Sequence, residues 1–270
     1  PGFKDPRTGS WDLRPHAARI ESINEAALTT WQSVTESEDW RSTPMVSTVN
    51  SAASRTLATL ALKPRIGSFN LQFSTGWHET SDFEKGRFEK VWGPTSWSNT
   101  ILQGPHLYIS TPLYKQPNES MLHNQDWTST DLEALPANAQ PITQYKPAGD
   151  RTTYDRLYTH WDDSPARDHY RIAWRAMAAN TGERTFIPSI IPPGSTHVHG
   201  VSSAGSSDLI VSSLPAILGA SSSLLADFSV RSSPKSTIQF STFNRLPRLN
   251  EDDSLTLRIV ARVLRLNCFT

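Results

Sequence analysis

The chain has a single cysteine, no long apolar run and no formal net charge. Its single cysteine, Cys268, cannot form an internal disulfide, which excludes a disulfide framework and is typical of a reducing compartment such as the cytoplasm. No run of about 18 apolar residues is present, so we expect no segment that spans a membrane. The first residues, PGFKDPRTGS, also lack the charged and then apolar pattern of a secretory leader.

Motifs of the common catalytic folds are missing as well. The sequence contains no GxxxxGKS/T, GxGxxG, GxSxG or HExxH pattern, and a lone cysteine cannot supply a CxxC pair for zinc. We therefore expect this chain to hold no metal ion or other cofactor of its own.

The 26 basic and 26 acidic side chains give a formal net charge of zero. This balance argues against a surface coated with basic residues for non-specific binding to nucleic acid. A local basic patch is still permitted, because binding depends on how charge is distributed over the surface. Residues 151–270 contain slightly more arginine than acid, which is compatible with such a patch.

Nine tryptophans argue against disorder, and the patterning predicts an α+β fold with mixed short strands, a few helices and long ordered loops. Apolar residues recur at helical spacing in residues 11–34. Residues 55–73 alternate as strands do, and residues 76–94 indicate a surface hairpin around a charged turn. The proline-rich residues 103–150 are expected to form ordered loop, with a strand at 106–110 and a short helix at 129–135.

The second half begins with Tyr170, Trp174 and Met177 at helical spacing, which predicts a short helical element. A strand is expected at residues 184–191, before a double proline. Residues 209–231 predict a helix that begins near Ser212 or Ser213, because Pro215 fits only the first turn of a helix.

The organisation predicted from these elements has two lobes. Residues 1–95 form an N-terminal lobe or connector, residues 96–270 form the second lobe, and the two meet near residues 95–110. The absent initiator methionine and the apolar end RIVARVLRLNCFT predict that the chain is a piece of a longer polypeptide.

Two sets of residues have the chemistry of metal ligands. His197 and His199, two positions apart in an extended segment, are expected on the same side, but the sequence names no third ligand. Asp162, Asp163 and Asp168 could form a carboxylate cluster, although solvated acids in a loop are the more common outcome. A metal-dependent nuclease lobe is therefore one alternative function.

Cations near aromatic residues give a stronger pattern. Arginine can bind phosphate through two hydrogen bonds and can read guanine edges, whereas asparagine can read adenine. The competing interpretation is that these arginines are a solvated face and that Trp174 is a core residue. The candidate DNA-binding residues are Lys115, Asn124, Arg171, Arg175, Asn180, Arg184, Arg231 and Lys235.

Four stretches carry a resemblance to a known family. They are GWHETSDFEKGRF, RIAWRAMAANTGERTFIPSIIPPG, LPAILGASSSLLADFSVR and SPKSTIQFSTFNRLPR, within residues 76–248. Together they resemble the C-terminal region of large bacterial N6-adenine DNA methyltransferases of restriction-modification and phage-defence systems, including type IIG-like, BREX-type and DISARM-type methylases.

The resemblance implies a target-recognition domain that follows the catalytic domain and binds double-stranded DNA. The Asn-Pro-Pro-Tyr type motif and the glycine turn for S-adenosylmethionine are missing here, so the fragment is expected not to methylate DNA by itself. The cofactor S-adenosylmethionine is expected for the missing methyltransferase domain, which would be a partner, as would other defence-system subunits. Arg171 and Arg175 are then expected to be positioned by Trp174 and the strand at 187–191, with their guanidinium groups free.

A further alternative is a protein-protein interaction module of a defence complex. Trp127, Trp161 and the proline-rich middle would form its binding surface. A large exposed aromatic patch without neighbouring arginine would favour this alternative.

Overall fold

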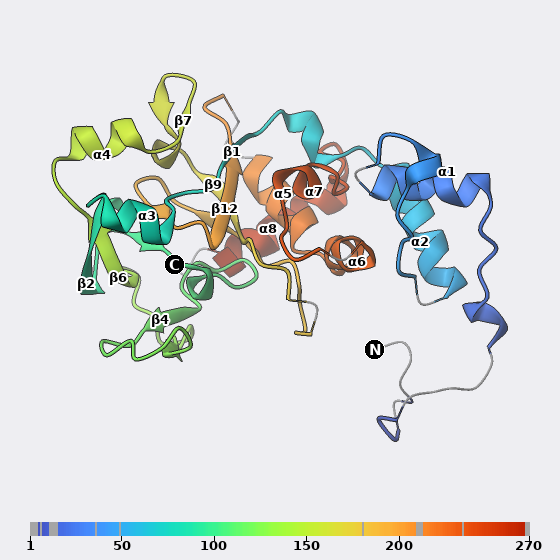
Figure 1. The fold of residues 1–270 in the computed structure, drawn as a ribbon, viewed down its shortest axis with the longest axis horizontal. Coiled ribbons are helices and arrows are strands. Elements are labelled where there is room, and N and C mark those ends of the chain that lie inside the picture. The colour runs from blue at the N-terminus through green and yellow to red at the C-terminus, as the bar shows by residue number, and fades with distance from the viewer. Residues whose placement is uncertain are drawn as a thin grey trace.

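The computed structural model describes residues 5, 7–10, 16–35, 37–48, 50–179, 181–208, 213–233 and 235–267. The molecule is elongated, with two N-terminal helices at one end, a sheet covered by helices in the middle, and several small two-stranded sheets at the other end (Figure 1). The predicted α+β class is confirmed. Its likeness to a restriction-modification recognition domain stays a prediction.

The central sheet has four antiparallel strands in the order β1-β12-β9-β10. They are β1 (Gln72–Ser74), β12 (Val201–Gly205), β9 (Arg171–Arg175) and β10 (Pro188–Ile191). The predicted helical element at residues 170–177 is therefore wrong. Ile172 and Trp174 point to one face of the sheet, whereas Ala173 packs on the other, which is the alternation of a strand.

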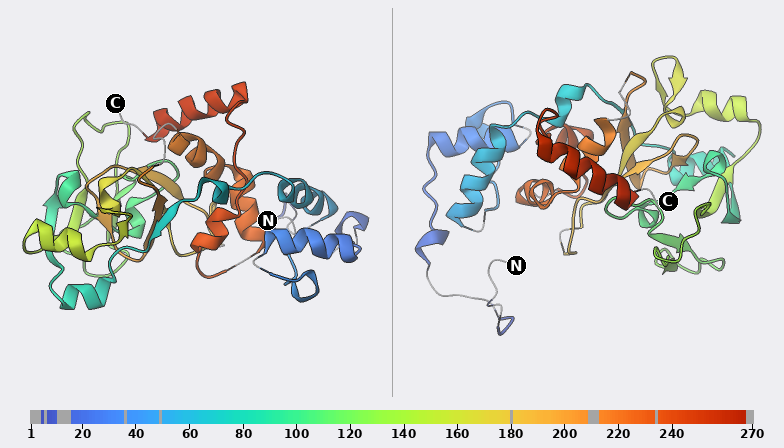
Figure 2. Two further views of the ribbon diagram at one scale, coloured as in Figure 1. Left: turned by 90° about the horizontal axis from the view of Figure 1, so that it is seen from above. Right: turned by 180° about the vertical axis from the view of Figure 1, so that it is seen from behind.

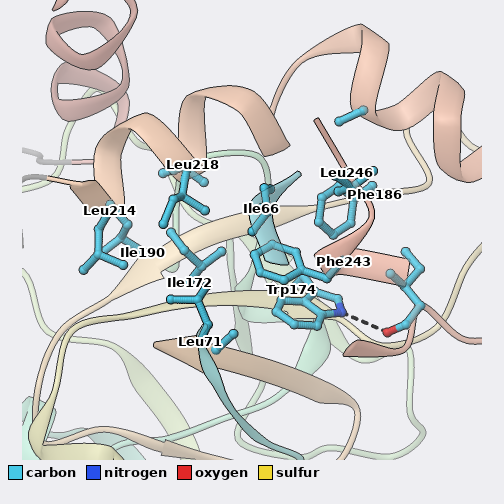
Figure 3. Packing of buried hydrophobic residues seen from close by; sticks show 14 of the residues in the cluster. Ile66, Leu71, Ile172, Trp174, Phe186, Ile190, Leu214, Leu218, Phe243 and Leu246 are labelled. Atoms are coloured by element: carbon cyan, nitrogen blue, oxygen red, sulfur yellow. Dashed lines mark hydrogen bonds between the residues drawn. The ribbon is translucent and has the colours of Figure 1, made fainter. Parts of the chain in front are cut away.

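One face of this sheet carries the main core (Figure 3). The Trp174 ring stacks on Phe243 with centroids 4.5 Å apart, and its Nε1 donates to the carbonyl of Ile238 at 3.0 Å. Trp174 is thus a core residue and no stacking surface. Four helices cover this face: α5 (Ser213–Ser221), α6 (Leu224–Ser232), α7 (Phe240–Asn244) and α8 (Ser254–Asn267).

The segment predicted as one helix over residues 209–231 contains two helices, α5 and α6. Residues 209–212 lie outside the described residues. The break falls at Ser222-Ser223, where the Ser223 hydroxyl caps α6 by accepting from the Ala226 N–H. Pro215 lies in the first turn of α5, as expected. Helix α8 packs along α5, and Figure 2 shows it from behind. Among the described helices none is by itself long and apolar enough to cross a membrane, and only the bent pair of α5 and α6 passes that test together.

The other face of the sheet and the adjoining end of the molecule are built from short elements. Leu102, Leu107, Ala173, Ile191 and Val201 form one small core, and a second, aromatic one lies around Trp77 and Trp161. The elements are α3 (Glu79–Glu84), β2 (Phe88–Pro94), β3 (Ile101–Leu102), β4 (Lys115–Pro117), β5 (Trp127–Ser129), β6 (Ile142–Pro147), α4 (Arg151–Leu157), β7 (His160–Trp161), β8 (Ser164–Pro165) and β11 (Thr196–His197). They pair as β2 with β6, β4 with β5, β7 with β8, and β3 with β11 in parallel.

Several predicted elements in this region are wrong. The charged turn of the expected hairpin at residues 76–94 includes the end of helix α3, so only β2 is a strand there. The expected strand at 106–110 begins in the 3-10 helix Gly104–His106 and continues as turns. The expected helix at 129–135 consists of the end of β5 followed by bends. Residues 103–150 were expected to be mostly loop, but they also contain the strands β4, β5 and β6.

The N-terminal helices are α1 (Glu25–Val34) and α2 (Ser51–Ala61). Asn24 caps α1 by accepting from the Ala27 N–H at 3.0 Å, so the C-terminal part of the helix predicted at 11–34 is confirmed. Residues 55–61, predicted as strand, belong to α2. Trp31, Val46 and Leu57 form a small core against Phe228 of α6.

The division at residue 95 stays a prediction. Strands from both sides of it pair with each other, since β1 pairs with β12 and β2 pairs with β6.

Candidate functional site

An open cavity of about 780 Å³ lies where α3, β6, the turn at residues 103–105 and the segment after β9 come together. Its size is within the range of small-ligand pockets, about 300–1,000 Å³. The lining combines amide, carboxylate, guanidinium and aromatic side chains with two methionines. It includes Glu79, Phe83, Lys90, Gln103, Met121, Asn124, Trp127, Gln144, Tyr145, Arg175, Met177, Arg184 and His199.

A hydrogen-bonded network runs along this lining. Glu79 Oε1 accepts from Gln103 Nε2 and from the Tyr145 hydroxyl, each at 3.0 Å. Gln144 Nε2 donates in turn to Gln103 Oε1 at 2.9 Å. Burial, together with the charge of Glu79, raises the pKa of Tyr145, so its hydroxyl keeps its proton and remains a donor.

Glu79 is fixed by the start of helix α3. His78 caps this helix through Nδ1, which accepts from the Ser81 N–H at 3.2 Å, and the backbone N–H of Glu79 donates to His199 Nδ1 at 3.4 Å. The rings of His78 and His199 stack with centroids 4.8 Å apart. The carboxylate is therefore held at a helix N-terminus, where negative charge is favoured.

Trp127 enters the cavity from β5. Its ring meets the His106 ring edge to face, with centroids 4.8 Å apart. Burial lowers the pKa of His106 to about 4, which keeps the imidazole neutral. Its Nδ1 accepts from the Gln103 N–H, and its Nε2 donates to the Ile142 carbonyl. The same histidine thus anchors both the tryptophan and the glutamine.

Arg175 reaches the cavity from the end of β9. Its Nε donates to the carbonyl of Leu107 at 2.9 Å, Nη2 donates to the same oxygen, and burial lowers the pKa of the guanidinium. The guanidinium lies 6.0 Å from the ring centroid of Tyr114, which stacks on Tyr108. Lys115 lies over the same Tyr114 ring at 5.5 Å. One edge of Arg175 is thus engaged by the protein, in contrast to the predicted free group.

Arg171 does not reach the surface. The side chain is fully buried, with Nη2 donating to the carbonyl and to the hydroxyl of Ser195, and Nε donating to the His169 carbonyl at 3.2 Å. The prediction that its guanidinium is free for DNA is therefore wrong. Arg171 instead ties β9 to the segment that carries β11.

Arg184 and Arg231 are joined to one acid. Asp227 of α6 lies 3.6 Å from Arg184 Nε and 2.8 Å from Arg231 Nε. Arg184 also donates to the carbonyl of Ser222 at 2.7 Å, and it lines the cavity. Arg231 donates to the carbonyl of Gly182 and lies outside the cavity lining.

The other candidates are dispersed. Asn124 is exposed and lines the cavity, whereas Asn180 lies outside the described residues. Lys235 is exposed beside a separate small hollow near Arg65 and Arg245. Of the eight predicted positions the structure brings Asn124, Arg175 and Arg184 to one place.

The candidate metal ligands do not converge. His197 is fully buried and shares a hydrogen bond with Ser203 at 2.8 Å, while His199 is exposed, so the expectation that both lie on one side is wrong. Asp162 accepts from Gln72 at 2.9 Å and from Ser207. Within the described parts of the chain, no group of three His, Cys, Asp or Glu is placed to hold a metal ion.

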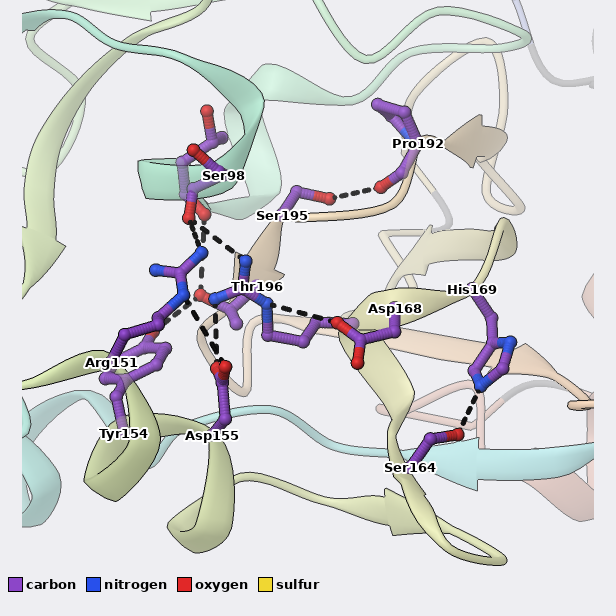
Figure 4. Close-up of polar contacts among 12 residues, drawn as sticks. Ser98, Arg151, Tyr154, Asp155, Ser164, Asp168, His169, Pro192, Ser195 and Thr196 are labelled. Atoms are coloured by element: carbon purple, nitrogen blue, oxygen red, sulfur yellow. Dashed lines mark hydrogen bonds and ion pairs between the residues drawn. The ribbon is translucent and has the colours of Figure 1, made fainter.

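Asp168 belongs to a different polar cluster (Figure 4). It lies 4.0 Å from Arg167 Nε, and Arg167 Nη1 lies 3.2 Å from Asp155 of α4. Its neighbour His169 shares a hydrogen bond with Ser164 at 2.7 Å. These contacts hold α4 and the β7–β8 turn against the strands, which is a structural role.

The residues that sequence reasoning missed are Glu79, Gln103, Gln144 and Tyr145. Glu79 stood in the Trp-His-Glu-Thr stretch that carries part of the resemblance, but nothing in that stretch pointed to a cavity. The partners of Glu79 are 24 and 66 positions further along the chain, so only the fold brings them together.

Comparison with known proteins identifies no family for this chain. No protein-family model matches the chain, and no curated protein is significantly similar to it.

Proposed function

We propose that this chain is the DNA-binding specificity domain of an N6-adenine DNA methyltransferase from a restriction-modification or phage-defence system, and that it is not catalytic by itself. The observation that carries the proposal is that Asn124, Arg175 and Trp127 line one open cavity. Amide and guanidinium groups are the side chains that read base edges, and an aromatic ring is a surface on which a base stacks. The resemblance over residues 76–248 supports the same function.

In this function the domain would grip DNA while the methyltransferase domain, with its S-adenosylmethionine, performs the chemistry. The formal charge of zero and the ion pair of Arg184 with Asp227 limit the positive charge at the cavity. Binding by the isolated domain is therefore expected to be weak. It should weaken further with salt, because each contact to a phosphate releases counterions.

The two alternatives have less support. Trp161 is only 1% exposed, so it cannot belong to an exposed aromatic patch, and Trp127 lines the same cavity as Arg175. A nuclease lobe would need a cluster of metal ligands, and no group of three His, Cys, Asp or Glu in the described residues could hold a metal ion. Asp162 and His197 are each hydrogen-bonded to other residues.

The test is binding of the chain to a mixed-sequence duplex of about 30 base pairs, close to three helical turns, followed by fluorescence anisotropy. We expect binding at about 50 mM salt that is weaker at about 200 mM. Asn124→Ala should lower the affinity by about 1–3 kcal/mol if the amide reads a base. Asn138→Ala, at an exposed position away from the cavity, is the matched control.

Failure of the folded protein to bind duplex at low salt would overturn the proposal and would favour the protein-interaction alternative. Equal losses of DNA affinity in Asn124→Ala and Asn138→Ala would show that the cavity is not part of the DNA-binding surface.

A further inference from the structure

The shape of the site restricts how it can meet DNA. An element that reads a duplex groove must protrude, because the base edges lie at the bottom of the groove. The site described above is a hollow of about 780 Å³. A hollow receives a part of the ligand that protrudes, and the part of DNA that can do so is a base rotated out of the stack.

The network in the cavity leaves hydrogen-bond acceptors open. Gln103 Nε2 and the Tyr145 hydroxyl both donate to Glu79 Oε1, and the amide nitrogen of Gln144 is engaged by Gln103 Oε1. No described residue donates to Glu79 Oε2 or to Gln144 Oε1. The cavity therefore presents a carboxylate oxygen and an amide oxygen to a ligand that brings N–H donors.

The same cavity provides a surface for a flat ring. Trp127 is half-buried in the lining, and the His106 ring holds it edge to face. Met121 and Met177, which also line the cavity, add flexible apolar surface. An aromatic face beside hydrogen-bond acceptors matches the two sides of a nucleobase, its ring face and its polar edge.

We propose that this cavity takes up a single unpaired base that carries an exocyclic amino group, an inference that rests on the proposed DNA-binding function. Adenine, cytosine and guanine each bring an amino group that can donate to Glu79, as cytosine does to acidic side chains in DNA complexes. Thymine has one ring N–H between two carbonyl oxygens, and these oxygens would face the acceptors of Glu79 and Gln144. Thymine is therefore the base that the cavity rejects.

The test compares duplexes that are fully paired with duplexes that contain one bulged nucleotide, by fluorescence anisotropy on the whole chain. A bulged adenine or cytosine should bind about tenfold more tightly than the paired duplex, because the bulge has already been unpaired. A bulged thymine should bind no better than the paired duplex.

The variant Glu79→Gln identifies the group that selects the base. The glutamine can still accept from Gln103 and Tyr145 through one oxygen, so the network is retained, but an NH₂ group replaces the open acceptor. We expect the preference for adenine and cytosine over thymine to be lost, with a gain for thymine, whose carbonyl oxygens can accept from that group. Glu84→Gln removes the same charge from the exposed end of α3 and should leave the preference unchanged.

The outcomes separate this inference from the function on which it rests. Equal affinity for paired and bulged duplexes in both the wild type and Glu79→Gln would overturn the inference while the DNA-binding function stands. A preference for bulged thymine in the wild type would overturn it as well. Absence of binding to every DNA would overturn both.

Discussion

Asp227 Oδ2 lies 2.8 Å from Arg231 Nε, one helical turn further along α6. The other oxygen of the same carboxylate accepts the backbone N–H groups of Thr185 and Phe186, at 2.7 and 2.8 Å, and lies 3.6 Å from Arg184 Nε. Asp227 is only 5% exposed. This one acid therefore joins α6 to the segment before β10. It also engages two arginines that the sequence analysis predicts to bind DNA.

Replacement of Asp227 by asparagine tests this role. The amide keeps the shape of the side chain but leaves two partly buried guanidinium groups without their charge partner, so we expect a loss of about 2–3 kcal/mol in the free energy of unfolding. Urea unfolding followed by tryptophan fluorescence measures the loss. Asp252→Asn, at an exposed position, should change the stability by less than about 0.5 kcal/mol. Equal values for the two variants would show that solvent screens the ion pairs.

Arg171 gives the second prediction. Arg171→Ala leaves an internal void and removes the donors to the Ser195 and His169 carbonyls, so we expect it to lower the free energy of unfolding by about 3 kcal/mol. The DNA affinity of the folded fraction should stay the same, because the guanidinium never reaches the surface. Arg156→Ala, at an exposed position on α4, is the control for stability. A fall in affinity at unchanged stability would mean that Arg171 does contact DNA.

Arg171 also helps to explain why the sequence did not predict strand β9. Tyr170, Trp174 and Met177 fit a helical spacing, but Tyr170 and Met177 are exposed in the structure, so the three share no buried face. Arg171 and Arg175 are the first and last residues of the strand. Prediction of secondary structure from the spacing of apolar residues assumes that buried positions carry apolar side chains. Arg171 breaks that assumption, because backbone carbonyls satisfy its donors in the interior.

Local chemistry was predictable where it depends on neighbours in sequence. The first turn of α5 was anticipated from Pro215, and the core position of Trp174 was the more common of the two interpretations weighed. At the site, Asn124, Arg175 and Arg184 were named and do line the cavity. The network of Glu79, Gln103 and Gln144 was not named, because its members come from three segments that are distant in sequence.

Two buried histidines predict how stability depends on pH. Burial, with a smaller effect of the nearby Arg171 charge, lowers the pKa of His197 to about 3, and burial lowers the pKa of His106 to about 4. Both values lie below the pKa of about 6.5 in the unfolded chain, so the unfolded state binds more protons in between. Stability should therefore be complete above about pH 6.5 and fall as the pH drops, by about 2 kcal/mol per histidine at pH 5.

Urea unfolding at pH 7 and pH 5 measures this loss. His197→Gln can still accept from Ser203 but does not titrate, so the difference between the two pH values should shrink by about 2 kcal/mol. His160→Gln, at an exposed position, should leave the difference unchanged. A wild-type stability that is flat between pH 7 and pH 5 would contradict the buried neutral state of both histidines.

Gly76 gives the last prediction, because its surroundings and its backbone both exclude a side chain. Its φ is +69°, and a Cβ built there would lie 2.1 Å from the His197 carbonyl oxygen. Gly86 has nearly the same backbone, with φ of +67°, but open space around the Cβ position. Gly86→Ala should therefore cost about 1–2 kcal/mol for the left-handed backbone alone, and Gly76→Ala should cost at least about 2 kcal/mol more for the clash.

The clash also has a functional consequence. The Trp77 N–H donates to the His197 carbonyl at 2.9 Å, and the His199 N–H donates to the Trp77 carbonyl at 2.8 Å, so the segment around Gly76 is fixed to the strand that ends beside the cavity. Moving that segment displaces Glu79, three residues further on. Gly76→Ala should therefore lose the preference for amino-bearing bulged bases under conditions where the protein is still folded, whereas Gly86→Ala should keep it. Equal destabilisation of the two variants would show that the chain relaxes around the new methyl group, and the position of Glu79 would then not depend on Gly76.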